Sequence, residues 1–95
     1  MTNSEMQNRF VRSLAKRCGD IMETADRCDL QSLARAFRNL AGLAESYGYQ
    51  AVTEVSRRCE QLCAAALTDK RPLTPFDRAR LFAGVTSIRM YGATS

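Results

Sequence analysis

The sequence predicts an all-α protein, an antiparallel up-down bundle of four helices. Apolar residues recur at steps of three and four along most of the chain, which is the spacing of one face of a helix. No stretch shows the strict alternation of apolar and polar residues that is typical of a strand. Four amphipathic helices with short connections each need a partner for one face, and an antiparallel bundle supplies it.

The first helix is expected from about Asn3 to Arg27. Thr2 and Glu5 have the spacing of a capping box at its start. Gly19 weakens the middle of the helix. The residues expected to face the core form one stripe: Phe10, Leu14, Cys18, Ile21, Ala25 and Cys28.

The second helix is expected to begin after Asp29, a favourable N-cap residue, and to end at Gly48, which suits a left-handed C-cap. Tyr47 and Tyr49 flank this glycine, and we expect both rings to pack over the turn. The buried face is expected to hold Leu30, Leu33, Ala34, Phe37, Leu40, Ala41 and Ala44.

The third helix is expected from about Gln50 to Leu67, and the polar segment from Thr68 to Pro72 ends it. Its apolar stripe consists of Val52, Val55, Cys59, Leu62, Cys63 and Ala66.

The fourth helix has clear start signals. Thr74 can cap it, Pro75 suits the first helical position, and Asp77 lies favourably in the first turn. The helix should fray near Gly92. We expect its core residues to be Phe76, Leu81, Phe82, Val85 and Ile88.

The composition indicates one small globular domain over residues 1–95, with 45% hydrophobic and 25% charged residues. The net charge of +4 comes mostly from arginines spread along the chain, without the dense cluster that nucleic-acid binding usually shows. The basic pairs Lys16-Arg17 and Arg57-Arg58 are therefore interpreted as solubilising surface. We expect no membrane span, no signal peptide and a cytoplasmic location.

The four cysteines, in a cytoplasmic protein, are expected to be reduced thiols. A four-thiolate zinc site is conceivable, but Cys59 and Cys63 lack the usual spacing of a zinc knuckle. All four cysteines also lie on the apolar stripes, which favours core packing. We predict no metal and no cofactor.

The stretch from Leu33 to Gly48 resembles the helix that carries the phosphorylated histidine in histidine phosphotransfer (HPt) domains. That helix has small or apolar residues, then His-x-Leu-Lys-Gly, and a glycine that closes it. Leu40, Gly42 and Gly48 match the pattern. Arg38 stands in place of the histidine and Ala41 in place of the lysine. The resemblance extends over roughly Phe10 to Cys63 and implies an HPt-like bundle.

These departures remove the chemistry that the resemblance implies. The sequence contains no histidine, and an arginine guanidinium has no free lone pair for attack on phosphorus. Ser46 has no base at hand to activate its hydroxyl. We therefore expect a protein that is not an enzyme.

Binding remains compatible with the resemblance. In the family, the histidine enters the acidic, magnesium-binding pocket of a receiver domain. The corresponding partner-binding residues here are Arg35, Arg38, Asn39, Gly42, Glu45 and Ser46, which lie off the apolar stripe and should be exposed. The favoured function is a non-catalytic module of two-component signalling that docks on a receiver domain or a histidine kinase. The alternative is a structural or adaptor bundle for protein–protein or self-association; a weaker one is a basic protein associated with nucleic acid.

Overall fold

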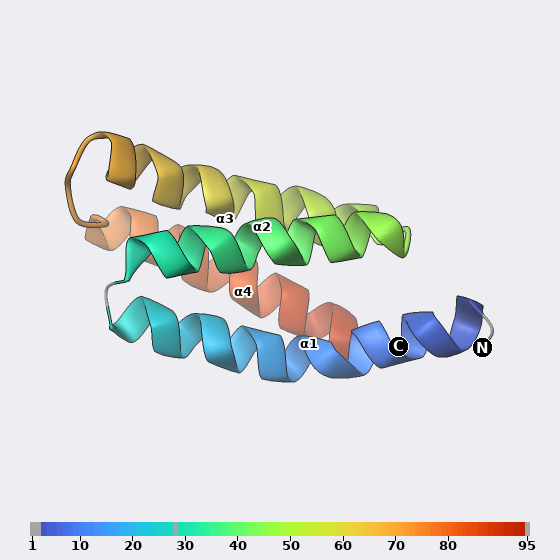
Figure 1. Cartoon of the computed structure of the whole chain (residues 1–95). Helices are drawn as coiled ribbons and strands as arrows, with labels where there is room; N and C mark the ends of the chain where they lie inside the picture. The colour runs from blue at the N-terminus through green and yellow to red at the C-terminus, as the bar shows by residue number, and fades with distance from the viewer. Residues whose placement is uncertain (1–2, 28, 95) are drawn as a thin grey trace.

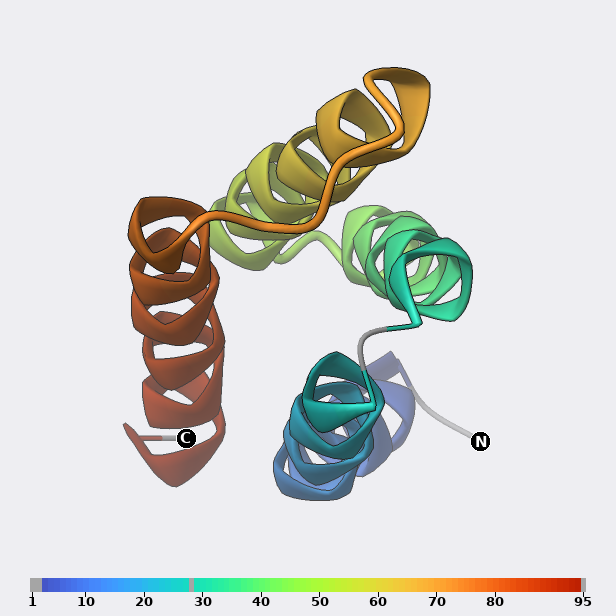
Figure 2. The ribbon, with the colours of Figure 1, turned by 90° about the vertical axis from the view of Figure 1, so that its left-hand side faces the viewer.

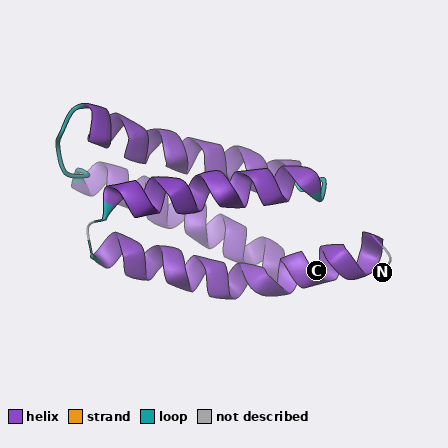
Figure 3. Cartoon of the chain, in the orientation of Figure 1, coloured by secondary structure: helices purple, strands orange, loops and turns teal. Residues whose placement is uncertain are grey.

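The computed structural model describes residues 3–27 and 29–94 of the chain. It contains four helices: α1 (Asn3–Asp26), α2 (Leu30–Ser46), α3 (Gln50–Thr68) and α4 (Pro75–Thr94). Successive helices run in opposite directions along a bundle of 44 × 20 × 19 Å (Figure 1). The described residues form no strand (Figure 3). The predicted all-α antiparallel four-helix bundle is confirmed.

Two helices, α2 and α4, begin where a side chain satisfies the first backbone N–H groups. The Asp29 carboxylate accepts hydrogen bonds from the backbone N–H and the hydroxyl of Ser32, at 3.1 and 2.7 Å. At α4, the Asp77 backbone N–H donates to the Thr74 hydroxyl, and the Thr74 backbone N–H donates to the Asp77 carboxylate. These two bonds form a capping box with aspartate as the acid. The box expected at Thr2 lies outside the described residues.

The order around the bundle follows the chain, and α1 closes the ring by packing beside α4 (Figure 2). Apolar side chains from all four helices fill the centre. The fully buried ones with the largest volumes are Leu14, Leu33, Phe37, Leu40, Val52 and Ile88. Each of these residues lies on a predicted stripe or buried face, so the periodicity located the centre of the core correctly.

The two tyrosines that flank Gly48 are half-buried, as predicted. Their rings lie 5.2 and 5.5 Å from the ring of Phe10 in α1, measured between centroids. These contacts tie the connection between α2 and α3 to the first helix. Such aromatic pairs each add about 0.5–1.5 kcal/mol beyond the area that they bury.

Two predicted core residues of α4 are at the surface instead. Phe76 is 67% exposed and Phe82 is 58% exposed. Leu81, Val85 and Ile88 occupy the inner face of α4, and Phe82 lies about 100° around the helix from Leu81. Phe82 therefore lies at the edge of the inner face, and Phe76 lies on the side of α4 that points away from the core. The prediction was wrong for both phenylalanines. Cys28, also predicted to face the core, lies outside the described residues.

None of the helices in the described part of the chain has the length and apolar character that crossing a membrane requires.

Candidate functional site

The predicted docking residues lie together on the outer face of α2, and all of them are exposed. Positions three, four and seven apart fall on one side of a helix, which explains how these side chains share one surface. We call this surface the Arg38 face. It consists of Arg35, Arg38, Asn39, Gly42, Glu45 and Ser46.

Arg38 projects from the middle of α2, and its side chain is 73% exposed. Its Nε donates a hydrogen bond to Oε1 of Glu60 on α3, at 3.1 Å. The rest of the guanidinium forms no hydrogen bond within residues 3–27 and 29–94. The two sides of the pair differ in exposure, because the Glu60 side chain is only 22% exposed. Most of the Arg38 guanidinium therefore lies in solvent, whereas Glu60 lies against the bundle.

A second ion pair joins α2 and α3, about two helical turns from Arg38 and about one turn from Glu60. Nη2 of Arg57 on α3 donates to Oε2 of Glu45 at 2.7 Å, and both side chains are more than half exposed. The Arg38–Glu60 and Arg57–Glu45 pairs therefore link α2 to α3 along one edge of the Arg38 face. They also place two acids beside the arginines, so this edge carries charges of both signs.

Gly42 lies at the centre of the Arg38 face and is exposed. A Cβ atom added there would meet no atom within 4 Å beyond the neighbouring residues and backbone of its own helix. The bundle has room for a methyl group, although glycine in a helix costs about 0.5–1 kcal/mol relative to alanine. No packing contact within the described chain requires the glycine. Its smooth surface would matter to a molecule that approaches from outside.

Two further positions on α2 bear on the comparison with the HPt pattern, Ser46 and Ala41. Ser46 Oγ donates to the backbone carbonyl of Gly42 at 3.0 Å, so its hydrogen bond goes to its own helix. Ala41, at the position of the family's lysine, is only 4% exposed. A side chain at position 41 points into the bundle, whereas position 38 points out of it.

The residue spacing along α2 predicts the members of the Arg38 face but not the residues of α3 that pair with them. Glu60 and Arg57 were not predicted to contribute, because pairing with α2 depends on the relative register of two helices. The only signal was the basic pair Arg57-Arg58, which was interpreted as solubilising surface. In the structure Arg57 pairs with Glu45, whereas Arg58 lies beside a groove between α3 and α4.

Cys18, Cys59 and Cys63 are free thiols buried in the core, as their positions on the apolar stripes predicted. Burial raises the pKa of Cys59 to about 11 and that of Cys63 to about 12. Metal ligation requires the thiolate, which burial disfavours. Among the described residues, no three cysteine, aspartate or glutamate side chains are grouped to hold a metal ion. Cys28, the fourth candidate ligand, lies outside them.

Comparison with models of known protein families, with curated proteins and with solved structures finds no match to this chain. The interpretation of the Arg38 face therefore rests on its residues and their geometry.

Proposed function

We propose that this chain is a non-catalytic docking module that binds the acidic pocket of a receiver domain, or a histidine kinase, through the Arg38 face. Occupancy of the pocket modulates phosphoryl transfer between other proteins, and the chain itself takes no phosphoryl group. The protein acts in two-component signalling and has no enzymatic activity of its own.

The observation that carries the proposal is the pairing of a projecting arginine with an exposed, unpacked glycine one turn further along α2. Arg38 is 73% exposed, and Gly42 leaves the surface beside it flat. A guanidinium is planar and can donate two parallel hydrogen bonds to a carboxylate or a phosphoryl group. A flat stretch of helix surface with Arg38 projecting beside it suits a concave pocket lined by carboxylates.

A pull-down from native lysate, with the captured proteins identified by mass spectrometry, tests this proposal. The baits are the wild type, Arg38→Ala and Arg12→Ala, the last being an exposed arginine on α1. The wild type and Arg12→Ala should enrich the same receiver-domain protein, and Arg38→Ala should enrich it less. Calorimetry with the purified receiver should then give at least about tenfold weaker binding for Arg38→Ala, the equivalent of about 1.4 kcal/mol.

A second pair of variants separates docking from stability. Gly42→Gln should weaken receiver binding because a side chain now stands on the flat face, whereas Gly19→Gln on α1 should leave it unchanged. Both glycines are exposed, and both have open space around them. Equal binding by the wild type and Arg38→Ala, or enrichment of no receiver protein by any bait, would contradict the proposal.

The exposed apolar side chains of α4 favour a second candidate, an adaptor bundle that associates with proteins or with itself. Phe76, Phe82 and Met90 are 67%, 58% and 61% exposed. Exposed apolar patches commonly mark interaction surfaces. Sedimentation velocity over a hundredfold range of concentration would detect self-association, which the receiver-docking function does not require.

A further inference from the structure

A groove runs between α3 and α4, on the side of α3 away from its contacts with α2. The two helices approach closely at Gly84, where an added Cβ would lie 2.7 Å from Cys59 Sγ and 3.2 Å from Val55 Cγ1. They separate at the end of the bundle that carries their connection (Figure 2). The space between them has a volume of about 580 Å³.

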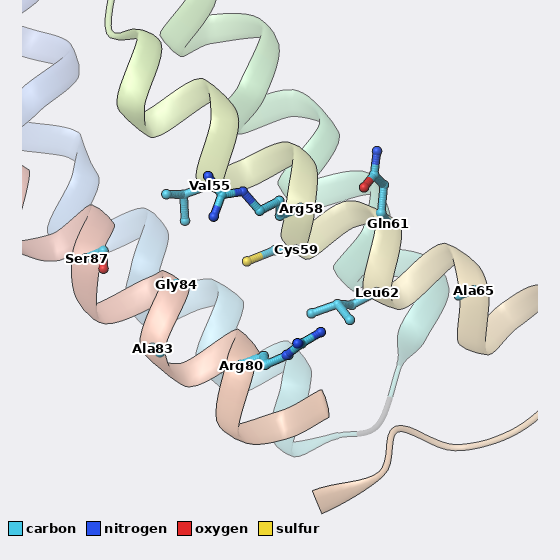
Figure 4. A pocket seen from close by; sticks show the side chains of 10 residues that line it. All are labelled: Val55, Arg58, Cys59, Gln61, Leu62, Ala65, Arg80, Ala83, Gly84 and Ser87. Atoms are coloured by element: carbon cyan, nitrogen blue, oxygen red, sulfur yellow. The ribbon is translucent and has the colours of Figure 1, made fainter. Parts of the chain in front are cut away.

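The groove has an apolar floor and a cationic rim (Figure 4). Val55, Leu62 and Ala65 line it from α3, and Ala83 and Gly84 line it from α4. One arginine stands on each wall, Arg58 on α3 and Arg80 on α4.

No carboxylate lies among the residues that line the groove. Arg58 forms no ion pair with any described residue, and Arg80 lies over the ring of Phe76, 4.8 Å from its centroid. By contrast, the arginines that face α2 or the connection after α3 are paired with acids, as in Arg38–Glu60 and Arg71–Asp77. The groove therefore presents positive charge that the described chain does not neutralise, directly above apolar surface.

Beside the groove, an exposed aromatic ring adds to the apolar surface of α4. Phe76 lies one helical turn before Arg80 and is 67% exposed, so the apolar surface extends toward the start of α4. With a rise of about 1.5 Å per residue, the strip from Phe76 to Ser87 is about 16 Å long, or three helical turns. An elongated apolar trough of this length fits the apolar stripe of a helix.

The charges of Arg58 and Arg80 indicate which kind of helix could bind in the groove. An α4 helix from a second copy would bring Arg80 against the arginines of the groove, and like charges would oppose the contact. A helix with aspartate or glutamate beside its apolar stripe would pair with Arg58 and Arg80 from both walls. We propose that the α3–α4 groove binds an acidic amphipathic helix of another protein, independently of the Arg38 face.

The proposal can be tested with two synthetic helical peptides of about five turns. Both carry leucine at alternating steps of three and four, one with glutamate and the other with lysine beside the leucine stripe. Fluorescence anisotropy measures the affinities, and amide shifts in 15N NMR spectra locate the contacts. The acidic peptide should bind one to one and shift the amides of Leu62, Ala65 and Ala83, and the lysine peptide should not bind.

Exposed substitutions complete the test. Arg80→Glu should weaken binding of the acidic peptide by about tenfold or more, since attraction becomes repulsion. Ala83→Glu, an exposed position on the groove wall, should do the same by both charge and bulk. Arg12→Glu on α1 makes the same change of net charge as Arg80→Glu and should change the affinity less than about twofold.

Equal binding of both peptides, or of neither, would overturn the proposal, as would amide shifts confined to α1 and α2. A wild-type dimer that buries α4 would also overturn it and would identify a second copy as the occupant. Because Arg38→Ala leaves the groove intact, that variant should bind the acidic peptide normally. Failure of receiver docking and failure of groove binding are therefore distinguishable.

Discussion

At the scale of single residues, α2 and α3 end in the same backbone motif, but the residue with a positive φ is a glycine after α2 and a lysine after α3. After α2, Gly48 has a φ of 82°, and the N–H of Tyr49 donates to the carbonyl of Ala44 at 2.9 Å. After α3, Lys70 has a φ of 51°, and the N–H of Arg71 donates to the carbonyl of Ala66 at 3.0 Å. Both are Schellman motifs, in which glycine is favoured because a left-handed conformation crowds a Cβ atom.

Lys70→Gly should therefore stabilise the protein, by about 1 kcal/mol, because the strain of a left-handed lysine is removed. Urea denaturation followed by circular dichroism measures the free energy of unfolding. Gly48→Ala is the reverse experiment and should lower that free energy by about 1 kcal/mol. A loss of stability in Lys70→Gly would show that the flexibility of glycine in the unfolded chain outweighs the relief of strain.

Ser56 is another residue whose environment is unfavourable. It is fully buried on α3, and its hydroxyl has no hydrogen-bond partner within the described residues. Burying an unpaired hydroxyl costs about 1–3 kcal/mol. Ser56→Ala should therefore raise the free energy of unfolding by about 1 kcal/mol in the same urea experiment.

Ser13→Ala is the control for this substitution, because the Ser13 hydroxyl donates to the carbonyl of Phe10 at 2.6 Å and accepts from Arg17. Removing a hydroxyl that has partners should give no gain. If both variants were equally stabilised, helix propensity rather than the unpaired hydroxyl of Ser56 would be the cause.

At the scale of helices, the sequence predicted α1, α2 and α3 more accurately than the orientation of α4. Leu33, Phe37 and Leu40 define one apolar face of α2, and polar residues occupy the opposite face. In α4, apolar residues point in all directions, so periodicity does not indicate whether the side with Leu81 or the side with Phe82 is buried. In the structure, the side with Leu81 packs against the other helices and Phe82 is exposed.

The candidate site shows the same limit. The exposed face of α2 followed from its residue spacing, but the Arg38–Glu60 pair depends on how α2 and α3 are aligned. The α3–α4 groove depends on the angle at which two helices diverge. Neither of these geometric relations is encoded in the pattern of a single helix.

The contact between α3 and α4 leads to a prediction about Gly84. A methyl group at Gly84 would press on Cys59 Sγ, so Gly84→Ala should destabilise the bundle by about 1–3 kcal/mol. Gly19→Ala and Gly42→Ala, where space is open, should instead stabilise it by about 0.5–1 kcal/mol. Thermal unfolding of the three variants distinguishes local crowding from helix propensity.

A double variant identifies the atom responsible. Cys59→Ala removes the sulfur that lies closest to the added methyl group. In the Cys59→Ala background, Gly84→Ala should therefore cost clearly less than it does in the wild type. Equal costs in the two backgrounds would locate the clash elsewhere.

At the scale of the whole molecule, the buried thiols couple folding to pH. Burial raises the pKa of Cys18, and it raises the pKa of Cys59 to about 11 and of Cys63 to about 12, from an ordinary value of 9.0. Between pH 9 and these values the folded protein keeps protons that the unfolded chain releases. The free energy of unfolding must then fall as pH rises, because stability decreases wherever the folded state binds more protons.

We therefore expect the midpoint of urea denaturation under reducing conditions to be nearly constant from pH 7 to 8.5 and to decline above pH 9. The control is Cys59→Ala/Cys63→Ala, which removes two of the three thiols that are buried in the described part of the chain. This variant should be less stable at pH 7, because it leaves cavities, but its stability should depend less steeply on pH above 9. Parallel declines in the two proteins would show that groups other than the core thiols cause the loss at high pH.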